Sequence, residues 1–161
     1  MIARIAMAAL LAAFAAGVES GNAAAQLLDK KALSIVEAKK IAATAMTEAE
    51  KNNWTVVVAI VDDGGNLMYL ERRDGTQLAS AGIAVGKART ALLYKRPTKA
   101  LEEIVNTGGR PSVMTLSPDI VTVEGGLPLV HGGVIIGAIG VSGVTSAQDG
   151  LVAKAGADTL K

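Results

Sequence analysis

The 161-residue chain contains no cysteine, a single histidine and very few aromatic residues. Without cysteine it can form neither disulfides nor thiolate nucleophiles. Phenylalanine, tyrosine and tryptophan make up 2% of the residues, so the chain offers no aromatic platform on which nucleic-acid bases could stack. Its formal charge of +1 also argues against electrostatic binding of nucleic acid.

The shortage of histidine limits the catalytic and metal chemistry. A Ser-His-Asp unit would need His131, which falls at the tip of a predicted hairpin, and Gly140-Val141-Ser142-Gly143 lacks the spacing of a nucleophile elbow. Zinc needs three or four converging ligands, and one histidine without cysteine argues against such a site. An enzyme that uses carboxylates alone stays open, although no pair is singled out by spacing. The sequence therefore favours a binding protein over an enzyme.

Half of the residues are hydrophobic, and with so few aromatics the core must consist of Val, Ile, Leu, Ala and Met. The many small residues of the chain allow helices to pack close to a sheet. A chain of this length is expected to form one domain and to bury roughly two-thirds of its unfolded surface.

The N-terminus has the features of a secretory signal peptide. Arg4 supplies a positive charge, the apolar run Ile5–Ala16 is too short to span a bilayer, and Ala23-Ala24-Ala25 is a small-residue cleavage pattern. Polar residues after the apolar run argue against the alternative, an uncleaved membrane anchor. The sequence thus predicts a signal peptide over residues 1–25 and a single domain over 26–161, exported to a bacterial periplasm or secreted.

Capping and periodicity signals predict helices and strands in the order α-β-β-α-α-β-β-β-α. The predicted helices start at Ser34, span Leu78–Tyr94, span Pro97–Asn106 and start at Ser146 with Asp149 closing a capping box. The predicted strands are Trp54–Val61, Leu67–Arg72, Ile120–Val123, Leu127–Val130 and Val134–Val141. The segment Thr107–Pro118 has no regular pattern and could form a lid, a subunit contact or a mobile loop.

The last predicted strand, Val134–Val141, is apolar at every position except its two glycines. A strand that is apolar on both faces must be covered on both faces, so it is expected in the interior of the sheet. Alternation would place Val134, Ile136 and Ala138 on one face and Ile135, Ile139 and Val141 on the other. Gly137 and Gly140 leave room for the close approach of a helix.

Two motifs in the chain resemble those of a known family. The first is the stretch Glu124–Gly150, EGGLPLVHGGVIIGAIGVSGVTSAQDG. The second combines Arg72, Asp74 and Gly75 with the pattern A-x-x-KA-x-TA of Ala84–Ala91. On these motifs the chain resembles the GlcG/HbpS-like family of small haem-binding proteins, whose domain also occurs at the C-terminus of PduO-type cobalamin adenosyltransferases. The resemblance covers nearly all of Leu33–Leu160.

The resemblance implies an α/β (α+β) fold of profilin-like architecture, in which three layers, α/β/α, contain a five-stranded antiparallel sheet. It also implies a homo-oligomer, from a dimer to an octamer. The expected partner is a small-molecule tetrapyrrole, with no nucleic acid and no membrane after signal cleavage.

Haem is the cofactor that the resemblance implies. Haem binding needs an apolar slot, cations near the propionates and usually one axial donor such as His, Met or Tyr. The candidate donors are His131, Met114 and Tyr94, and the candidate cations are Arg72, Lys87 and Arg110. Each of these side chains has an ordinary structural alternative. Some family members use a histidine near the mature N-terminus, which this chain lacks.

The favoured function is therefore an exported haem-binding protein that sequesters, delivers or senses haem, or helps to degrade it. One alternative is a cofactor-free interaction module that acts through its oligomer surfaces, since the N-terminal histidine is missing. The other is a protein that binds a small acid, suggested by the association of GlcG with glycolate metabolism.

Overall fold

The computed structural model describes residues 26–160, and the predicted signal peptide lies outside this range. Contacts within the chain divide it at Lys30, and every described helix and strand belongs to the unit that begins at Lys31. None of the helices between residues 26 and 160 is both long and apolar enough to cross a membrane.

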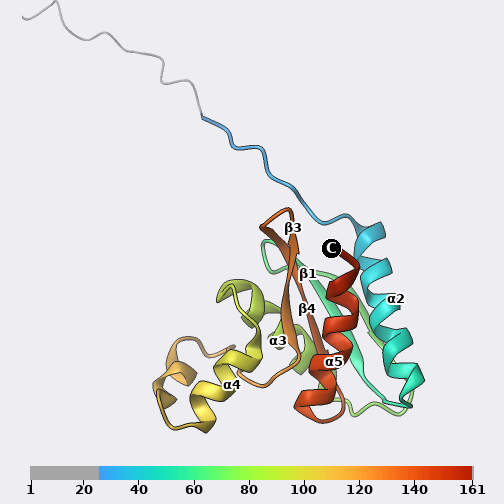
Figure 1. Cartoon of the computed structure of the whole chain (residues 1–161), viewed down its shortest axis with the longest axis vertical. Helices are drawn as coiled ribbons and strands as arrows, with labels where there is room; N and C mark the ends of the chain where they lie inside the picture. Colours follow the sequence, from blue (N-terminus) through green and yellow to red (C-terminus); the bar gives the residue numbers. More distant parts are fainter. Residues whose placement is uncertain (1–25, 161) are drawn as a thin grey trace, which may run out of the picture. The chain divides into compact units, whose positions relative to one another are not determined.

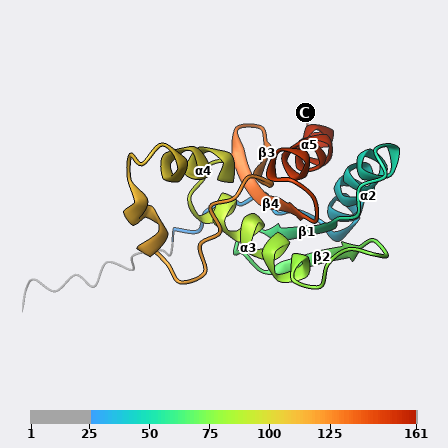
Figure 2. The same ribbon diagram turned by 90° about the horizontal axis from the view of Figure 1, so that it is seen from below.

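A four-stranded antiparallel sheet forms the middle of this unit (Figure 1), and its strand order is β2-β1-β4-β3 (Figure 2). Its strands are β1 (Val57–Asp62), β2 (Leu67–Arg72), β3 (Gly126–His131) and β4 (Val134–Ser142). The α-helices are α2 (Ile35–Lys51), α3 (Ser80–Leu93), α4 (Thr98–Asn106) and α5 (Ser146–Ala157), and two short 3₁₀ helices are η1 (Pro111–Thr115) and η2 (Asp158–Leu160). The predicted α+β class, the antiparallel sheet and the interior position of β4 are confirmed.

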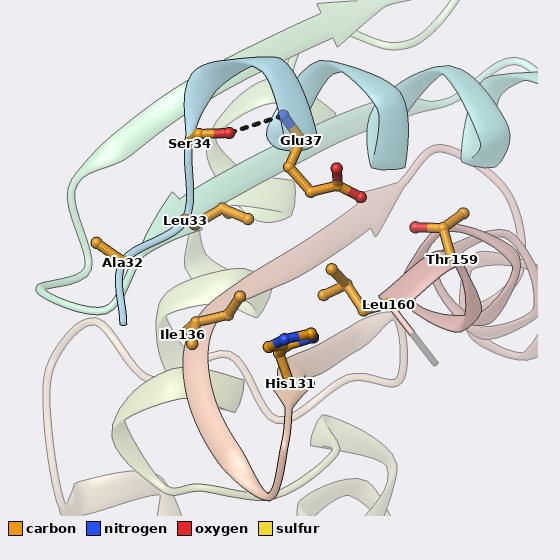
Figure 3. Close-up of a pocket in the computed structure, with 8 residues that line it drawn as sticks. All are labelled: Ala32, Leu33, Ser34, Glu37, His131, Ile136, Thr159 and Leu160. Carbon is orange, nitrogen blue, oxygen red and sulfur yellow. Dashed lines mark hydrogen bonds between the residues drawn. The ribbon is translucent and has the colours of Figure 1, made fainter. Parts of the chain in front are cut away.

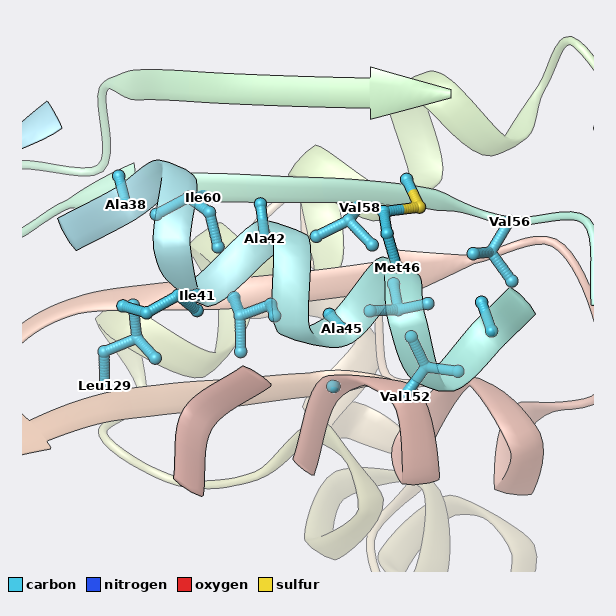
Figure 4. Close-up of a cluster of buried hydrophobic side chains, with 14 of the residues drawn as sticks. Ala38, Ile41, Ala42, Ala45, Met46, Val56, Val58, Ile60, Leu129 and Val152 are labelled. Atoms are coloured by element: carbon cyan, nitrogen blue, oxygen red, sulfur yellow. The ribbon is translucent and has the colours of Figure 1, made fainter. Parts of the chain in front are cut away.

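Helices cover both faces of the sheet: α2 and α5 lie on one side and α3 lies on the other (Figure 2). Successive side chains of β1 point to opposite faces of the sheet. Val58 and Ile60 belong to the hydrophobic cluster under α2 and α5. Val57 and Ala59 pack against α3 on the other face. Figure 4 shows the first cluster, in which the α2 side chains face β1 and α5. Its fully buried side chains are aliphatic, as the composition predicts.

The caps of α2 and α5 show how local sequence starts these helices. Ser34 is the N-cap of α2, and its hydroxyl accepts a hydrogen bond from the Glu37 amide at 3.2 Å, as predicted. The predicted cap of α5 is wrong by one residue. Thr145, in extended conformation, is the N-cap and forms a capping box with Gln148, while Ser146 is already helical.

The predicted fifth strand, Ile120–Val123, is wrong, so within residues 26–160 the sheet has four strands and not five. The backbone of this segment is held by side chains instead of by a neighbouring strand. The Val121 amide donates to the Thr90 hydroxyl at 2.9 Å, and the Glu124 amide donates to the Glu102 carboxylate at 2.7 Å. Side-chain acceptors on α3 and α4 thereby take up amides that a strand would pair.

A β-bulge in β4 changes which residues face each helix layer. Leu129 pairs with Gly137 and Val130 pairs with Ile135, so Ile136 is an extra residue in β4. Ile136 consequently joins the cluster under α2 and α5, and Ile135 packs on the α3 side. The strict alternation predicted for these two residues is wrong for this reason.

Gly140 sets the distance between α3 and the sheet. A Cβ atom added at Gly140 would lie 2.0 Å from the Ala84 carbonyl oxygen and 2.6 Å from the Ala88 nitrogen. The predicted close approach of a helix is therefore confirmed at Gly140. At Gly137 it is wrong, because the nearest atom is the carbonyl oxygen of Val61 in β1, at 2.4 Å.

We expect Gly140→Ala to lower the free energy of unfolding by about 1–3 kcal/mol or more, because the new methyl group would push α3 off the sheet. Urea denaturation followed by circular dichroism measures this. Gly82→Ala is the matched control in the same helix layer, since nothing lies within 4 Å of a Cβ added at Gly82. The free energy of unfolding of Gly82→Ala should rise by up to about 1 kcal/mol, because alanine has a higher helix propensity than glycine. Equal losses in both variants would contradict the close packing at Gly140.

Candidate functional site

The six candidate side chains do not converge on one site. The structure brings Tyr94 and Arg110 together in one groove and places His131 in a separate cleft. The remaining three candidates, Lys87, Arg72 and Met114, line neither.

Lys87 forms a buried ion pair in the interior of the domain. Its Nζ lies 2.7 Å from Oδ2 of Asp149, and both side chains are 2–3% exposed. Oδ1 of Asp149 also accepts a hydrogen bond from the Val144 amide at 3.2 Å. Burial raises the pKa of the Asp149 carboxyl above its ordinary value, although the hydrogen bond and the charge of Lys87 act against this rise. The ammonium group is thus committed to Asp149 and is not presented to a ligand.

The Gly125-Gly126 motif passes directly over this ion pair. Gly125 has a φ of +128°, and a Cβ added there would lie 2.9 Å from Lys87 Nζ. A Cβ added at Gly126 would lie 2.3 Å from the Lys87 carbonyl oxygen. Side chains at either glycine would collide with Lys87, so the motif serves packing at this point.

Arg72 and Met114 are exposed, but each lies apart from the two cavities. Arg72 is the last residue of β2 and pairs in register with Val57. Met114 lies in η1 with 46% of its surface exposed, and its sulfur accepts a hydrogen bond from the Thr122 hydroxyl at 3.1 Å. The Met114 sulfur therefore already has a partner.

His131 lines a cleft of about 350 Å³ between the β3–β4 hairpin, the start of α2 and the end of the described chain (Figure 3). Leu33, Ile136 and Leu160 supply the apolar wall of this cleft, and the His131 ring lies beside the last two. Its volume falls within the roughly 300–1,000 Å³ that is usual for small-molecule sites.

Half of the residues that line the His131 cleft are polar: Ser34, Glu37, Thr159 and His131 itself. The exposed His131 ring makes no hydrogen bond with any residue between 26 and 160, so its nitrogens are open to a ligand. Glu37 is paired with Lys40 at 3.2 Å. The Lys31 ammonium lies at the hairpin tip, 3.6 Å from where a Cβ of Gly132 would be. The cleft thus combines one nitrogen donor, an apolar wall and the Glu37 carboxylate, with one cation nearby.

This donor set restricts the metal chemistry available to the cleft. Within the described range, no three His, Asp or Glu side chains come close enough to hold a metal ion. His131 can therefore supply one ligand to a metal whose other ligands come from a cofactor. A porphyrin iron meets this condition, because the macrocycle itself provides four nitrogens and the protein needs to add an axial one.

Sequence reasoning selected His131 as a candidate donor but did not predict the residues that line its cleft. Leu33 precedes α2 and Leu160 lies in η2, so the two ends of the domain meet at the β3–β4 hairpin. No local pattern links residues so far apart. The apolar residues that flank predicted helix ends were the available signal.

The Tyr94–Arg110 groove is smaller, about 180 Å³, and lies between the end of α3, α4 and η1. This volume is below the usual range for sites that hold a drug-sized molecule. Of the two cavities that contain candidate donors, the His131 cleft is the better match to a macrocycle.

Comparison with known proteins agrees with the motifs. A family model described as haem degrading protein HbpS-like matches residues 33–158. Protein GlcG of Escherichia coli is 50% identical over 113 residues, which are 70% of this chain and 83% of GlcG. The corrinoid adenosyltransferase PduO of Salmonella typhimurium is 32% identical over 120 residues, which are 73% of this chain and 36% of that enzyme.

Solved structures share the fold over almost their whole length. A double mutant of HbpS from Streptomyces reticuli has a TM-score of 0.78 and 31% identity, and the match covers 91% of this chain and 99% of that one. The crystal structure of a PduOC–haem complex has a TM-score of 0.75 and 30% identity, with 81% of this chain and 96% of that one covered.

We expect Lys87→Met to lose about 3–5 kcal/mol of stability at neutral pH, because Asp149 would be left buried without its counter-charge. The pKa of Asp149 should rise further, since the contributions of Lys87 that lower it are gone. A carboxyl whose pKa is higher in the folded than in the unfolded chain stabilises the fold below the unfolded pKa of 3.8 and loses that contribution as the pH rises through the folded pKa. The difference in free energy of unfolding between the natural protein and Lys87→Met should therefore increase as the pH rises.

Urea denaturation between about pH 4 and about pH 8 tests this dependence. Lys40→Met is the control, because it breaks a solvent-exposed ion pair and should change the free energy of unfolding little at any pH. A pH-independent deficit in Lys87→Met would show that Asp149 does not titrate in this range.

Proposed function

The chain belongs to the HbpS-like family, and from this premise we propose that it binds haem in the His131 cleft, with His131 as the axial ligand. The observation that supports this most directly is the His131 ring, whose nitrogens have no hydrogen-bond partner among residues 26–160 and which stands in an apolar-walled cleft. A structural neighbour with 30% identity, PduOC, has been solved with haem bound.

The residues around His131 suit such a ligand. Leu33, Ile136 and Leu160 offer apolar surface to the macrocycle. Burial of apolar area is the main source of affinity for a flat, hydrophobic ligand. Lys31 offers a positive charge near the hairpin tip for a propionate. When bound, haem would supply an iron that can bind small molecules and exchange electrons.

Export and assembly complete the proposal. The signal-peptide features of residues 1–25 support a role outside the cytoplasm, in which haem is sequestered, delivered or sensed. The description of the matching family model supports a link to haem degradation. A homo-oligomer is expected from the family resemblance.

We expect haemin titration of the purified protein to give a saturable, stoichiometric Soret band, and His131→Ala to abolish that band or to weaken binding at least about tenfold. Added imidazole should restore the band in His131→Ala, since it can occupy the space of the lost ring. Tyr94→Phe and Met114→Leu should behave like the natural protein, because neither side chain lines the His131 cleft.

An unchanged band in His131→Ala, with loss of the band in Tyr94→Phe or Met114→Leu, would move the haem site to the other donor. A broad band that never saturates in any of these proteins, with albumin as the competitor, would contradict specific haem binding.

We expect full-length protein expressed in a Gram-negative bacterium to be recovered from the periplasm with Gln26 as its first residue, because the cleavage pattern ends at Ala25. N-terminal sequencing of the periplasmic fraction measures this, and light scattering of the same sample should give a mass above that of one chain. An uncleaved cytoplasmic protein would contradict export, and a clean monomer would contradict assembly.

A further inference from the structure

The Tyr94–Arg110 groove has walls and polar groups of its own, and it shares no lining residue with the His131 cleft. Leu101 and Ile104 of α4 form one wall, since residues three apart lie on the same face of a helix. Val113 and Leu116 from η1 and its C-cap complete the apolar lining. The body of a ligand in this groove would therefore be apolar.

Two arginines stand at this apolar lining. Arg110 is exposed, and its guanidinium group makes neither a hydrogen bond nor an ion pair with any other residue in the described range. Arg96 uses its Nε to donate to the Tyr94 carbonyl at 3.1 Å, which leaves its two terminal nitrogens for another acceptor. Guanidinium groups stay charged at every relevant pH and present a fork that matches a carboxylate.

No acidic residue neutralises the groove from its lining. Neither acidic residue of α4 lines the groove. The Glu102 carboxylate accepts a hydrogen bond from the Glu124 amide at 2.7 Å, and Glu103 is exposed. The Tyr94 hydroxyl also has no partner among residues 26–160, so it adds a polar group at the aromatic edge of the groove. The groove thus combines an apolar lining with positive charge, and its arginine and tyrosine side chains keep polar groups that are not hydrogen-bonded within the described range.

From these groups we infer that the Tyr94–Arg110 groove is a second binding site, which takes a small monocarboxylate with an apolar body. The arginines bind the carboxylate, the phenol can add a hydrogen bond, and the aliphatic lining holds the chain of the acid. The volume of about 180 Å³ admits a ligand of this size and not a macrocycle. This inference does not depend on haem binding at His131.

Hexanoate is a suitable probe, and isothermal titration calorimetry of the full protein measures its affinity. We expect saturable binding of hexanoate, with acetate weaker because it lacks the apolar chain and hexan-1-ol weaker because it lacks the charge. The double variant Arg96→Gln/Arg110→Gln should lose at least about tenfold in affinity, since charge-assisted hydrogen bonds are lost. Both arginines are exposed, so the variant is expected to fold.

Lys95→Gln is the matched control. It removes one positive charge next to Arg96 but does not line the groove, so hexanoate affinity should stay unchanged. Haemin titration of the double variant should also give the same Soret band as the natural protein, because the two cavities are separate.

Equal affinities for hexanoate and hexan-1-ol would overturn the inference, as would a double variant that binds hexanoate as well as the natural protein. If hexanoate fails to bind and the double variant loses its Soret band, the groove holds haem propionates, and the inference is wrong. Loss of haem binding in His131→Ala alone would leave the hexanoate result unaffected, so the two sites can fail separately.

Discussion

The buried ion pair between Lys87 and Asp149 is the interaction on which the arrangement of this domain depends. Lys87 comes from α3 on one face of the sheet, and Asp149 comes from α5 on the other. The pair therefore joins the two helix layers where the chain enters β3, and Gly125 is the residue that leaves room for it. Desolvation of both charges is costly, so the pair itself adds little net stability, whereas the loss of either partner would leave an uncompensated buried charge.

A second constraint is the closeness of the layers. With almost no aromatic side chains, the core is filled by aliphatic residues and by backbone contacts, such as α3 on Gly140 and the α2 backbone on Gly156 of α5. Layers packed this tightly leave no room for a cofactor between them. The two cavities discussed above accordingly lie where chain ends, a hairpin and short helices meet the layers, and not between the sheet and its helices.

Local patterns were sufficient to predict most elements, because capping residues and apolar runs act over a few positions. Ser34 and the hydrophobic β1 and β4 runs are examples. Two of the errors have long-range causes: Thr90 and Glu102 accept hydrogen bonds from amides that a fifth strand would have paired, and a bulge turns Ile136 to the other face. In the site, residue type was enough to select His131, but Leu33 and Leu160 reach it only through the tertiary fold.

The motif residues and the proposed ligand residues have different roles. Lys87, Asp149, Gly125 and Gly140 lie in the motifs by which the chain resembles its family, and all four are used to pack the layers. The candidate donor His131 lies on the rim, in a cleft built from residues outside those motifs as well as within them. Family membership therefore accounts for the architecture, whereas the ligand chemistry proposed for this chain rests on a few side chains at the rim.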